Sequence, residues 1–206
     1  GFRGVVMQVK DTRLVFDHLV SAFFSHPGRE LFCVGVTGTN GKTTTTYLIE
    51  TILNHHDIPT GVIGTINHHL KEKTWSTELT TPEPLSLQAR LLEFKELGAR
   101  GAVMEVSSHA LEQRRADSVP FDAVVFTNLT RDHLDYHKTM KDYFLAKRRL
   151  FCELLTASTK FQTFAIVNSD DCYGRQLQIA DSATLWTYGE KEADFRFEIM
   201  SQKFSS

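Results

Sequence analysis

The sequence predicts one α/β domain in which helices cover both faces of a doubly wound, mostly parallel sheet. Short apolar runs alternate along the chain with segments of helical periodicity. Several of these runs are continuous rather than alternating in hydrophobicity, which is typical of parallel strands buried on both faces. A length of 206 residues is sufficient for one domain with a sizeable core.

The first half of the chain begins this alternation. Apolar runs predict strands over residues 4–9, 31–36, 60–66 and 101–106. Helical periodicity predicts helices over residues 14–24, 43–55 and 84–98. In the last of these helices, Leu87, Leu91 and Phe94 share one stripe, and Gly98 is a typical stop residue. Residues 71–73 are expected to form a solvated hairpin or loop, and the histidine pairs at 55–56 and 68–69 are expected at the surface.

The second half continues the same pattern. Strands are predicted over residues 122–129, 163–168 and 184–188, and helices over 140–155 and 170–181. Residues 194–200 again resemble a strand, and a polar tail follows them. Ligands of doubly wound sheets bind beyond the carboxyl ends of the strands. The unusual polar segments of this sequence fall at those ends, so we expect the functional site there.

Composition and charge exclude several classes of protein. Hydrophobic residues make up 41% of the chain and charged residues 23%, which are ordinary values for a globular protein. A net charge of −2 provides no basic footprint for nucleic acid. No apolar run approaches the length of a membrane span, and no signal peptide is evident. Three widely spaced cysteines, Cys33, Cys152 and Cys172, predict free thiols and therefore a cytoplasmic protein, which we expect to be a monomer.

The segment "TGTNGKT" at residues 37–43 connects a predicted buried strand to a predicted helix, which is the context of a phosphate-binding loop. It departs from the Walker A spacing, because Val36 stands where that pattern has its first glycine. The chemical parts are nevertheless present, since glycines allow the backbone to approach an anion at a helix N-terminus. Lys42 can reach terminal phosphates, and the Thr43 hydroxyl can bind Mg²⁺. The alternative is a glycine-rich turn that carries a lysine by chance.

A carboxylate and a polar run follow the strand predicted over residues 101–106. Glu105 near the end of that strand could complete a magnesium site with Thr43, or it could be an ion-paired or solvent-facing glutamate. Beyond it, Ser107, Gln113 and Arg115 offer a hydroxyl, an amide and a bidentate cation to an anionic substrate. Helix capping is the alternative role for a serine at this position.

Two further segments carry residues that could bind metal. His133 and His137 are four residues apart, as in helical zinc sites, but no third histidine or cysteine stands at a suitable spacing, so we reject a structural zinc. Lys147 lies on the apolar stripe of the helix predicted over 140–155. Such a lysine either extends its amine to the surface or is buried with a lowered pKa. A neutral amine can react with CO₂ to give a carbamate, which is an oxygen ligand for metal.

Four motifs in order resemble one known family. "GTNGKTT" is similar to the ATP loop of the Mur ligases and their relatives, the folylpolyglutamate synthases. "TTPEPLSLQ", "MEVSSHALEQRR" and "FTNLTRDHLDYHKTMKDYFLAKRRLF" resemble the MurE-type branch, which adds the third residue to UDP-MurNAc-L-Ala-D-Glu. The resemblance covers nearly the whole chain but only the central domain of a three-domain enzyme. It implies that residues 1–30 lead in from an absent N-terminal domain, that 31–206 form the ATP-binding domain, and that the C-terminal amino-acid-binding domain is absent.

The resemblance also implies roles for individual residues. Catalysis would involve Lys42, His133 and a carbamylated Lys147. Two Mg²⁺ ions would be held by Thr43, Glu105, His133 and the modified Lys147. The UDP-muramoyl substrate would contact Thr80, Thr81, Ser107, Gln113 and Arg115. ATP would contact Thr37, Gly38, Thr39, Asn40, Gly41, Lys42, Thr43, Thr44, Asn168 and Asp171, the last two near adenine and ribose.

The implied reaction is the formation of an amide bond during peptidoglycan precursor synthesis. ATP would activate the D-Glu carboxylate of UDP-MurNAc-L-Ala-D-Glu as an acyl phosphate, and the amine of meso-diaminopimelate or L-Lys would attack it. The alternatives are a folylpolyglutamate synthase-like ligase and a non-catalytic nucleotide-binding module on the same fold. The substrate motifs argue against the first, and the intact Lys42, Thr43, Glu105, His133 and Lys147 argue against the second.

Overall fold

The computed structural model describes residues 4, 6, 8–198 and 200 of the chain. Its centre is a nine-stranded sheet in the order β4-β3-β2-β5-β1-β6-β7-β8-β9. The strands are β1 Phe32–Thr37, β2 Thr60–Ile63, β3 His68–Leu70, β4 Lys73–Trp75, β5 Gly101–Glu105, β6 Ala123–Phe126, β7 Thr163–Asn168, β8 Ala183–Gly189 and β9 Phe195–Arg196. In this order, every neighbouring pair from β2 through β5, β1, β6, β7 and β8 to β9 is parallel. At the other edge, β3 and β4 form a hairpin in which β3 pairs antiparallel with both β2 and β4.

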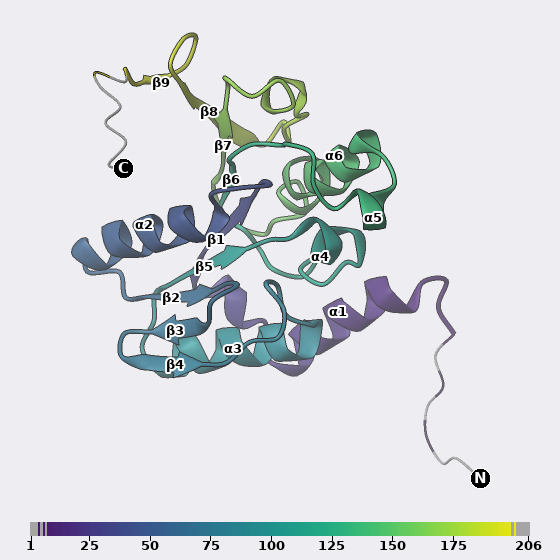
Figure 1. Ribbon diagram of the computed structural model, residues 1–206. Helices are drawn as coiled ribbons and strands as arrows, with labels where there is room; N and C mark the ends of the chain where they lie inside the picture. Colours follow the sequence, from purple (N-terminus) through teal and green to yellow (C-terminus); the bar gives the residue numbers. More distant parts are fainter. Residues whose placement is uncertain (1–3, 5, 7, 199, 201–206) are drawn as a thin grey trace.

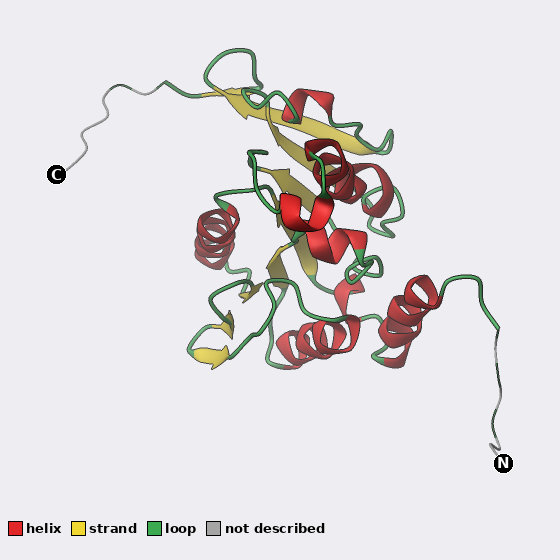
Figure 2. Ribbon diagram, turned by 45° about the vertical axis from the view of Figure 1, so that its right-hand side comes forward, coloured by secondary structure: helices red, strands yellow, loops and turns green. Residues whose placement is uncertain are grey.

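Helices cover the two faces of this sheet (Figures 1 and 2). They are α1 Thr12–Phe23, α2 Lys42–His55, α3 Pro84–Glu96, α4 Ser108–Glu112, α5 Leu134–His137 and α6 Met140–Arg149. Short turns of other helix types are η1 Pro27–Arg29, η2 Leu150–Leu154 and η3 Gly174–Gln176. Helix α2 lies on one face, and α3, α4 and α6 lie on the other. The predicted doubly wound α/β fold is thereby confirmed.

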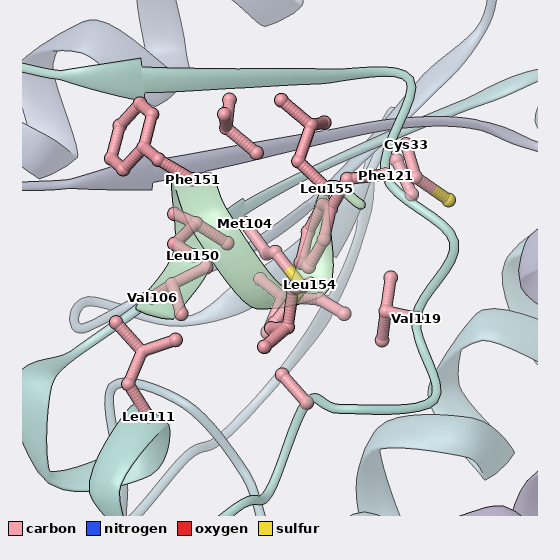
Figure 3. Packing of buried hydrophobic residues seen from close by; sticks show 14 of the residues in the cluster. Cys33, Met104, Val106, Leu111, Val119, Phe121, Leu150, Phe151, Leu154 and Leu155 are labelled. Carbon is pink, nitrogen blue, oxygen red and sulfur yellow. The ribbon is translucent and has the colours of Figure 1, made fainter. Parts of the chain in front are cut away.

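The larger part of the core lies between the sheet and the helices α3, α4 and α6. Figure 3 shows Leu150, Phe151, Leu154 and Leu155 of the α6–η2 segment packed beside Met104 and other core residues. A smaller valine-rich cluster on the opposite face packs against Tyr47 and Ile49 of α2. Because both faces are covered, the central strands are continuously apolar, and this is why the sequence pattern identified them as parallel.

Most predicted elements are present with shifted ends. Helices α1, α2 and α3 match the predictions over 14–24, 43–55 and 84–98, and Gly98 has the positive φ of +85° expected of a stop residue. The helix predicted over 140–155 divides into α6 and the π-helical turn η2. Of the strand predicted over 4–9, positions 5 and 7 lie outside the described residues, and the described positions 4, 6, 8 and 9 form no strand.

The helix predicted over residues 170–181 is wrong. Only η3 is helical there, because the side chain of Asp171 captures the backbone in a turn. Its Oδ1 accepts hydrogen bonds from the N–H groups of Tyr173 at 2.8 Å and Gly174 at 3.1 Å. An aspartate that bonds to nearby backbone groups in this way competes with helix formation.

The surface location predicted for the histidines at 68–69 is also wrong. Both belong to β3, which lies between β2 and β4, and the His69 ring packs against Tyr47 of α2, so His68 is only 5% exposed and His69 only 9%. The predicted hairpin at residues 71–73 is confirmed, but its two strands were not predicted. The histidine pair at 55–56 is exposed, as predicted.

Candidate functional site

A cavity of about 440 Å³ opens at the carboxyl ends of the central strands. Segments far apart in the sequence meet there, as expected for a sheet of this topology. The lining residues are Thr39, Asn40, Gly41, Lys42, Thr43, Thr65, Leu79, Thr80, Glu105, Ser107, Ser108, His109, Arg115, His133 and Lys147. The volume lies within the range of small-molecule sites.

The loop between β1 and α2 forms one wall of the cavity. Gly38 has a φ of +149°, and a Cβ atom at this position would lie 1.9 Å from Thr127 Oγ1, so a side chain is excluded. Thr127 Oγ1 donates to the carbonyl of Asn40 at 2.7 Å, and the N–H of Thr39 donates to the carbonyl of Asn128 at 2.9 Å. The segment after β6 therefore holds this loop, and its close approach requires glycine.

The first turn of α2 brings Lys42 and Thr43 into the cavity. Lys42 Nζ donates to the loop carbonyls of Gly38 at 2.9 Å and Thr39 at 2.8 Å. Burial lowers the pKa of Lys42, and the carboxylates of Glu105 and Asp132 partly oppose this shift. The N-terminus of a 14-residue helix and a lysine thus face the same space, which is the arrangement that binds phosphate groups.

Glu105 faces the phosphate loop from the end of β5 and is 1% exposed. Its Oε1 accepts hydrogen bonds from Thr43 Oγ1 and from the N–H of Thr65, both at 2.9 Å. Its Oε2 accepts from Thr65 Oγ1 at 3.1 Å. The structure therefore brings Thr43 and Glu105 together, and their hydroxyl and carboxylate oxygens are ligands of the kind that Mg²⁺ prefers.

Lys147 lies behind the loop on α6, and its 1% exposure shows that the side chain does not extend to the surface. Its Nζ donates to the Gly38 carbonyl at 2.9 Å and lies 4.7 Å from the ring centroid of Tyr143. Burial lowers the pKa of Lys147 well below its usual value, and the charge of Lys42 lowers it further. An amine in this position is prone to lose its proton, which is the state that reacts with CO₂.

His133 occupies an exposed turn before α5, with a φ of +51°. Its ring lies 5.1 Å from that of His109 and 5.9 Å from that of Tyr143, between centroids, and its Nε2 lies 3.5 Å from Asp132 Oδ2. Within the described residues, no cluster of three or more His, Cys, Asp or Glu side chains could hold a metal ion. His137 is instead buried, where its Nε2 lies 2.8 Å from Ser108 Oγ.

The predicted substrate-binding residues form the opposite wall. Arg115 Nη1 donates to the carbonyl of Thr81 at 3.0 Å, and Arg115 Nε donates to Gln113 Oε1 at 2.9 Å. Ser107 caps α4 by accepting from the N–H of Ala110 at 3.1 Å. Arg115 and Ser107 line the cavity together with Thr80, whereas Gln113 stands behind Arg115.

Thr81 is fully engaged inside the protein. It is 1% exposed, its Oγ1 donates to the carbonyl of Glu105 at 2.9 Å, and this oxygen accepts from the N–H of Ser107 at 3.0 Å. Thr81 therefore joins two walls of the cavity rather than lining it.

Five predicted nucleotide-binding residues lie outside the cavity lining, and Gly38 of the phosphate loop is one of them. Thr37 is buried and donates to the carbonyl of Val106 at 2.7 Å, and Thr44 is exposed on α2. Asn168 Nδ2 donates to the carbonyl of Thr127 at 2.8 Å. Asp171 Oδ2 accepts from the N–H of Leu129 at 2.9 Å. The last two residues thus hold the segment that in turn holds the phosphate loop.

The structure adds site residues that the sequence analysis missed. Thr65 and His109 line the cavity, and Tyr143, which is fully buried, places its hydroxyl 3.1 Å from Thr39 Oγ1. The available signal for Thr65 was its position directly beyond a buried strand. No sequence pattern connects Tyr143 with Thr39, because the two are 104 residues apart.

Comparison with known proteins shows a consistent set of relatives. Residues 36–206 match the family model described as the Mur ligase middle domain. The chain is 50% identical over 184 residues to the UDP-N-acetylmuramoyl-L-alanyl-D-glutamate–2,6-diaminopimelate ligase of Geobacter metallireducens, covering 89% of this chain and 36% of that protein. It is 47% identical over 186 residues to the protein of the same name from Aquifex aeolicus, covering 90% and 37%. The chain thus spans between a third and two fifths of the length of these relatives.

Solved structures agree with this comparison. A solved structure of a UDP-N-acetylmuramoyl-L-alanyl-D-glutamate–2,6-diaminopimelate ligase has a TM-score of 0.77 and 30% identity, and the match covers 91% of this chain and 39% of that one. The Mycobacterium tuberculosis folylpolyglutamate synthase complexed with ADP and AMPPCP has a TM-score of 0.67 at 16% identity, covering 85% and 47%. At that identity the second likeness shows a shared fold alone.

Proposed function

Because this chain belongs to the Mur ligase family, as the match over residues 36–206 shows, we propose that it is the ATP-binding part of a peptidoglycan precursor ligase. The observation that carries the proposal is the cavity in which Lys42 and Thr43 of the phosphate loop face Glu105, with Ser107 and Arg115 on the opposite wall. A phosphate site and an anion-binding wall within one cavity suit the transfer of a phosphoryl group to a carboxylate.

The proposed reaction forms an amide bond in two steps. A carboxylate oxygen of D-Glu in UDP-MurNAc-L-Ala-D-Glu attacks the γ-phosphorus of ATP, which gives an acyl phosphate and releases ADP. The amine of the third amino acid, meso-diaminopimelate or L-Lys, then attacks the acyl carbon, and phosphate leaves as the amide forms. Phosphoryl transfer of this kind depends on positioning and charge neutralisation more than on covalent help from protein.

The chain's own residues account for the positioning. The phosphate loop and the α2 N-terminus bind the phosphate groups, and Lys42 exchanges its two carbonyl partners for phosphate oxygens. The Thr43 hydroxyl and the Glu105 carboxylate would hold Mg²⁺, which supplies charge neutralisation at phosphate oxygens when it is bound. We assign a second such ion to His133 and to Lys147 as its carbamate, since an unmodified amine is no ligand for Mg²⁺.

The opposite wall would bind the UDP-muramoyl substrate. Arg115 faces the cavity with donor groups, Ser107 lines the cavity beside it, and Gln113 orients the Arg115 guanidinium. Asn168 and Asp171 lie beyond the loop on the side that we assign to adenine and ribose. The free-thiol cysteine pattern and the use of ATP in the proposed reaction support a cytoplasmic location. None of the described helices combines the length and apolar character that crossing a bilayer requires.

Calorimetric titration of this chain tests the proposal. In the presence of Mg²⁺ and a non-hydrolysable ATP analogue, we expect saturable binding of UDP-MurNAc-L-Ala-D-Glu and no binding of a folate. The variant Lys42→Ala should lose the nucleotide while keeping its circular dichroism spectrum, and Lys141→Ala, at an exposed position of α6, is the matched control. Binding of the folate in place of the dipeptide would contradict the assigned substrate, and unchanged nucleotide binding by Lys42→Ala would contradict the assigned loop.

The carbamate on Lys147 has a separate test. In ¹³C-bicarbonate, the wild-type chain should show a carbamate resonance that Lys147→Arg lacks and that Lys141→Arg retains. Persistence of the resonance in Lys147→Arg would assign the modification to another amine.

A further inference from the structure

We propose that Thr65 is a positioning residue that joins the Glu105 carboxylate to Thr80 and thereby makes the Thr80 hydroxyl a hydrogen-bond acceptor toward the substrate. The inference rests on the proposed function, because it concerns the substrate contacts of the same cavity. It adds a residue to the site and states which kind of group the substrate presents to Thr80, namely an N–H or an O–H.

Thr65 follows the carboxyl end of β2 and holds both oxygens of the Glu105 carboxylate. Its N–H donates to Oε1 at 2.9 Å, and its hydroxyl donates to Oε2 at 3.1 Å. The preceding Gly64 allows this approach, since a Cβ atom there would lie 2.5 Å from Glu105 Oε1. With Thr43 Oγ1 also donating to Oε1 at 2.9 Å, the carboxylate is fixed at the position where it faces the phosphate loop.

The direction of the next hydrogen bond follows from counting protons. A carboxylate oxygen only accepts, so the single hydroxyl hydrogen of Thr65 is used toward Glu105. Thr65 Oγ1 also lies 3.0 Å from Thr80 Oγ1, and that contact can be a hydrogen bond only if Thr80 is the donor. The one hydrogen of the Thr80 hydroxyl therefore points toward Thr65, and its oxygen lone pairs remain for a ligand.

The cavity walls consequently differ in hydrogen-bonding character. Arg115 presents donors only. Ser107 Oγ accepts from the N–H of Ala110 at 3.1 Å and lies 3.3 Å from Thr81 Oγ1, so the free donors of this wall are those of Arg115. Carboxylate or phosphate groups of the substrate belong at these donors. An amide N–H or a sugar hydroxyl belongs at Thr80, where an anionic group would meet only lone pairs.

The test compares two substitutions that preserve shape or chemistry. Thr65→Val keeps the backbone N–H and the branched side chain but removes the hydroxyl, and Thr65→Ser keeps the hydroxyl. Thr51→Val is the control, because among the described residues the Thr51 hydroxyl bonds only to the Tyr47 carbonyl within α2. Calorimetry would measure binding of a non-hydrolysable ATP analogue with and without Mg²⁺, and binding of UDP-MurNAc-L-Ala-D-Glu.

Thr65→Val should weaken the Mg²⁺-dependent part of nucleotide binding and dipeptide binding by about tenfold each, the usual effect of losing a hydrogen bond to a charged group. Thr65→Ser and Thr51→Val should stay close to wild type, and Mg²⁺-free nucleotide binding should not change. Two results would overturn the assigned role of Thr65. Either Thr65→Val weakens nucleotide binding equally with and without Mg²⁺, or Thr65→Val does not weaken nucleotide binding at all. If the wild-type chain binds no dipeptide, the proposed substrate fails, and the Mg²⁺ comparison still decides the role of Thr65.

A double-mutant cycle tests the direction of the Thr80 hydrogen bond. Thr80→Val should weaken dipeptide binding by about tenfold in the wild-type background. In the Thr65→Val background, Thr80→Val should weaken dipeptide binding clearly less, because Thr65 no longer orients the Thr80 hydroxyl there. Additive effects in dipeptide binding would overturn the relay through Thr65.

Discussion

Replacing Asp17 by asparagine should stabilise the protein at neutral and alkaline pH, and the gain should vanish in acid. Asp17 lies on α1 and is fully buried. Its Oδ2 accepts a hydrogen bond from the N–H of Ser118, but its Oδ1 has no partner among the described residues. Burial raises the pKa of Asp17 from 3.8 to about 7, and the nearby Asp117 carboxylate contributes in the same direction.

The size and sign of the effect follow from this shift. The folded-state pKa lies about 3 units above the unfolded-state value of 3.8, and each unit corresponds to about 1.4 kcal/mol. Below pH 3.8 both states are protonated and the side chain carries no ionisation penalty. As the pH rises toward 7, the unfolded chain releases its proton first, so folding stability falls by about 4 kcal/mol in total. Asparagine keeps an acceptor oxygen for Ser118 and cannot ionise.

Urea unfolding of wild type and Asp17→Asn, from about pH 5 to about pH 8, measures the difference directly. We expect the variant to gain about 3 kcal/mol of stability relative to wild type between about pH 5 and about pH 7, and little more above that. Asp181→Asn, at an exposed position, is the matched control and should keep the wild-type dependence on pH. Parallel pH profiles for wild type and Asp17→Asn would refute the assignment of a buried, ionisable carboxyl.

Further substitutions test other parts of the structure. Gly38→Ala should lower the free energy of unfolding by more than about 2 kcal/mol and abolish nucleotide binding, because its Cβ would lie 1.9 Å from Thr127 Oγ1. Gly98 has a φ of +85° and no atom within 4 Å of a Cβ built there, so Gly98→Ala should lower the free energy of unfolding by about 1 kcal/mol and leave nucleotide binding intact. Equal effects of the two alanines on nucleotide binding would contradict the loop geometry. Burial lowers the pKa of His68 to about 4, so wild type should lose about 3 kcal/mol of stability as the pH falls from 6.5 toward 4. His68→Leu should remove this loss, and a wild-type-like acid profile of the variant in urea unfolding would contradict the prediction. Tyr143→Phe should weaken nucleotide binding by about fivefold through loss of its contact with the phosphate loop, and wild-type affinity in a fluorescence titration would show that the contact contributes nothing.

The elements that the sequence predicted correctly are those with strong local patterns. The strand β1, the glycine-containing loop and α2 follow one another directly, so hydrophobicity and glycine spacing were sufficient to identify them. The periodicity of α6 placed Lys147 on the apolar stripe, and the structure buries it there. Glu105 and Thr43 could be paired because the carboxyl ends of neighbouring parallel strands meet at one edge of the sheet.

The errors of the sequence analysis have equally local causes. The helix predicted over 170–181 fails because one aspartate side chain, Asp171, competes for the backbone N–H groups. His68 was assigned to the surface because the strands of a short hairpin show no clear periodicity. Its burial depends on β2 and β4 arriving around it from other parts of the chain.

The sequence by itself determined the fold class, the phosphate loop and the chemical types of the residues around it, because each depends on neighbours within one element or one turn. Only the tertiary structure decided that Thr81 is engaged internally, that Tyr143 contacts the phosphate loop and that Thr65 holds the Glu105 carboxylate. The last two contacts join residues 104 and 40 positions apart. Hydrogen-bond direction and burial at such contacts depend on how strands and helices pack, and no local pattern encodes that packing.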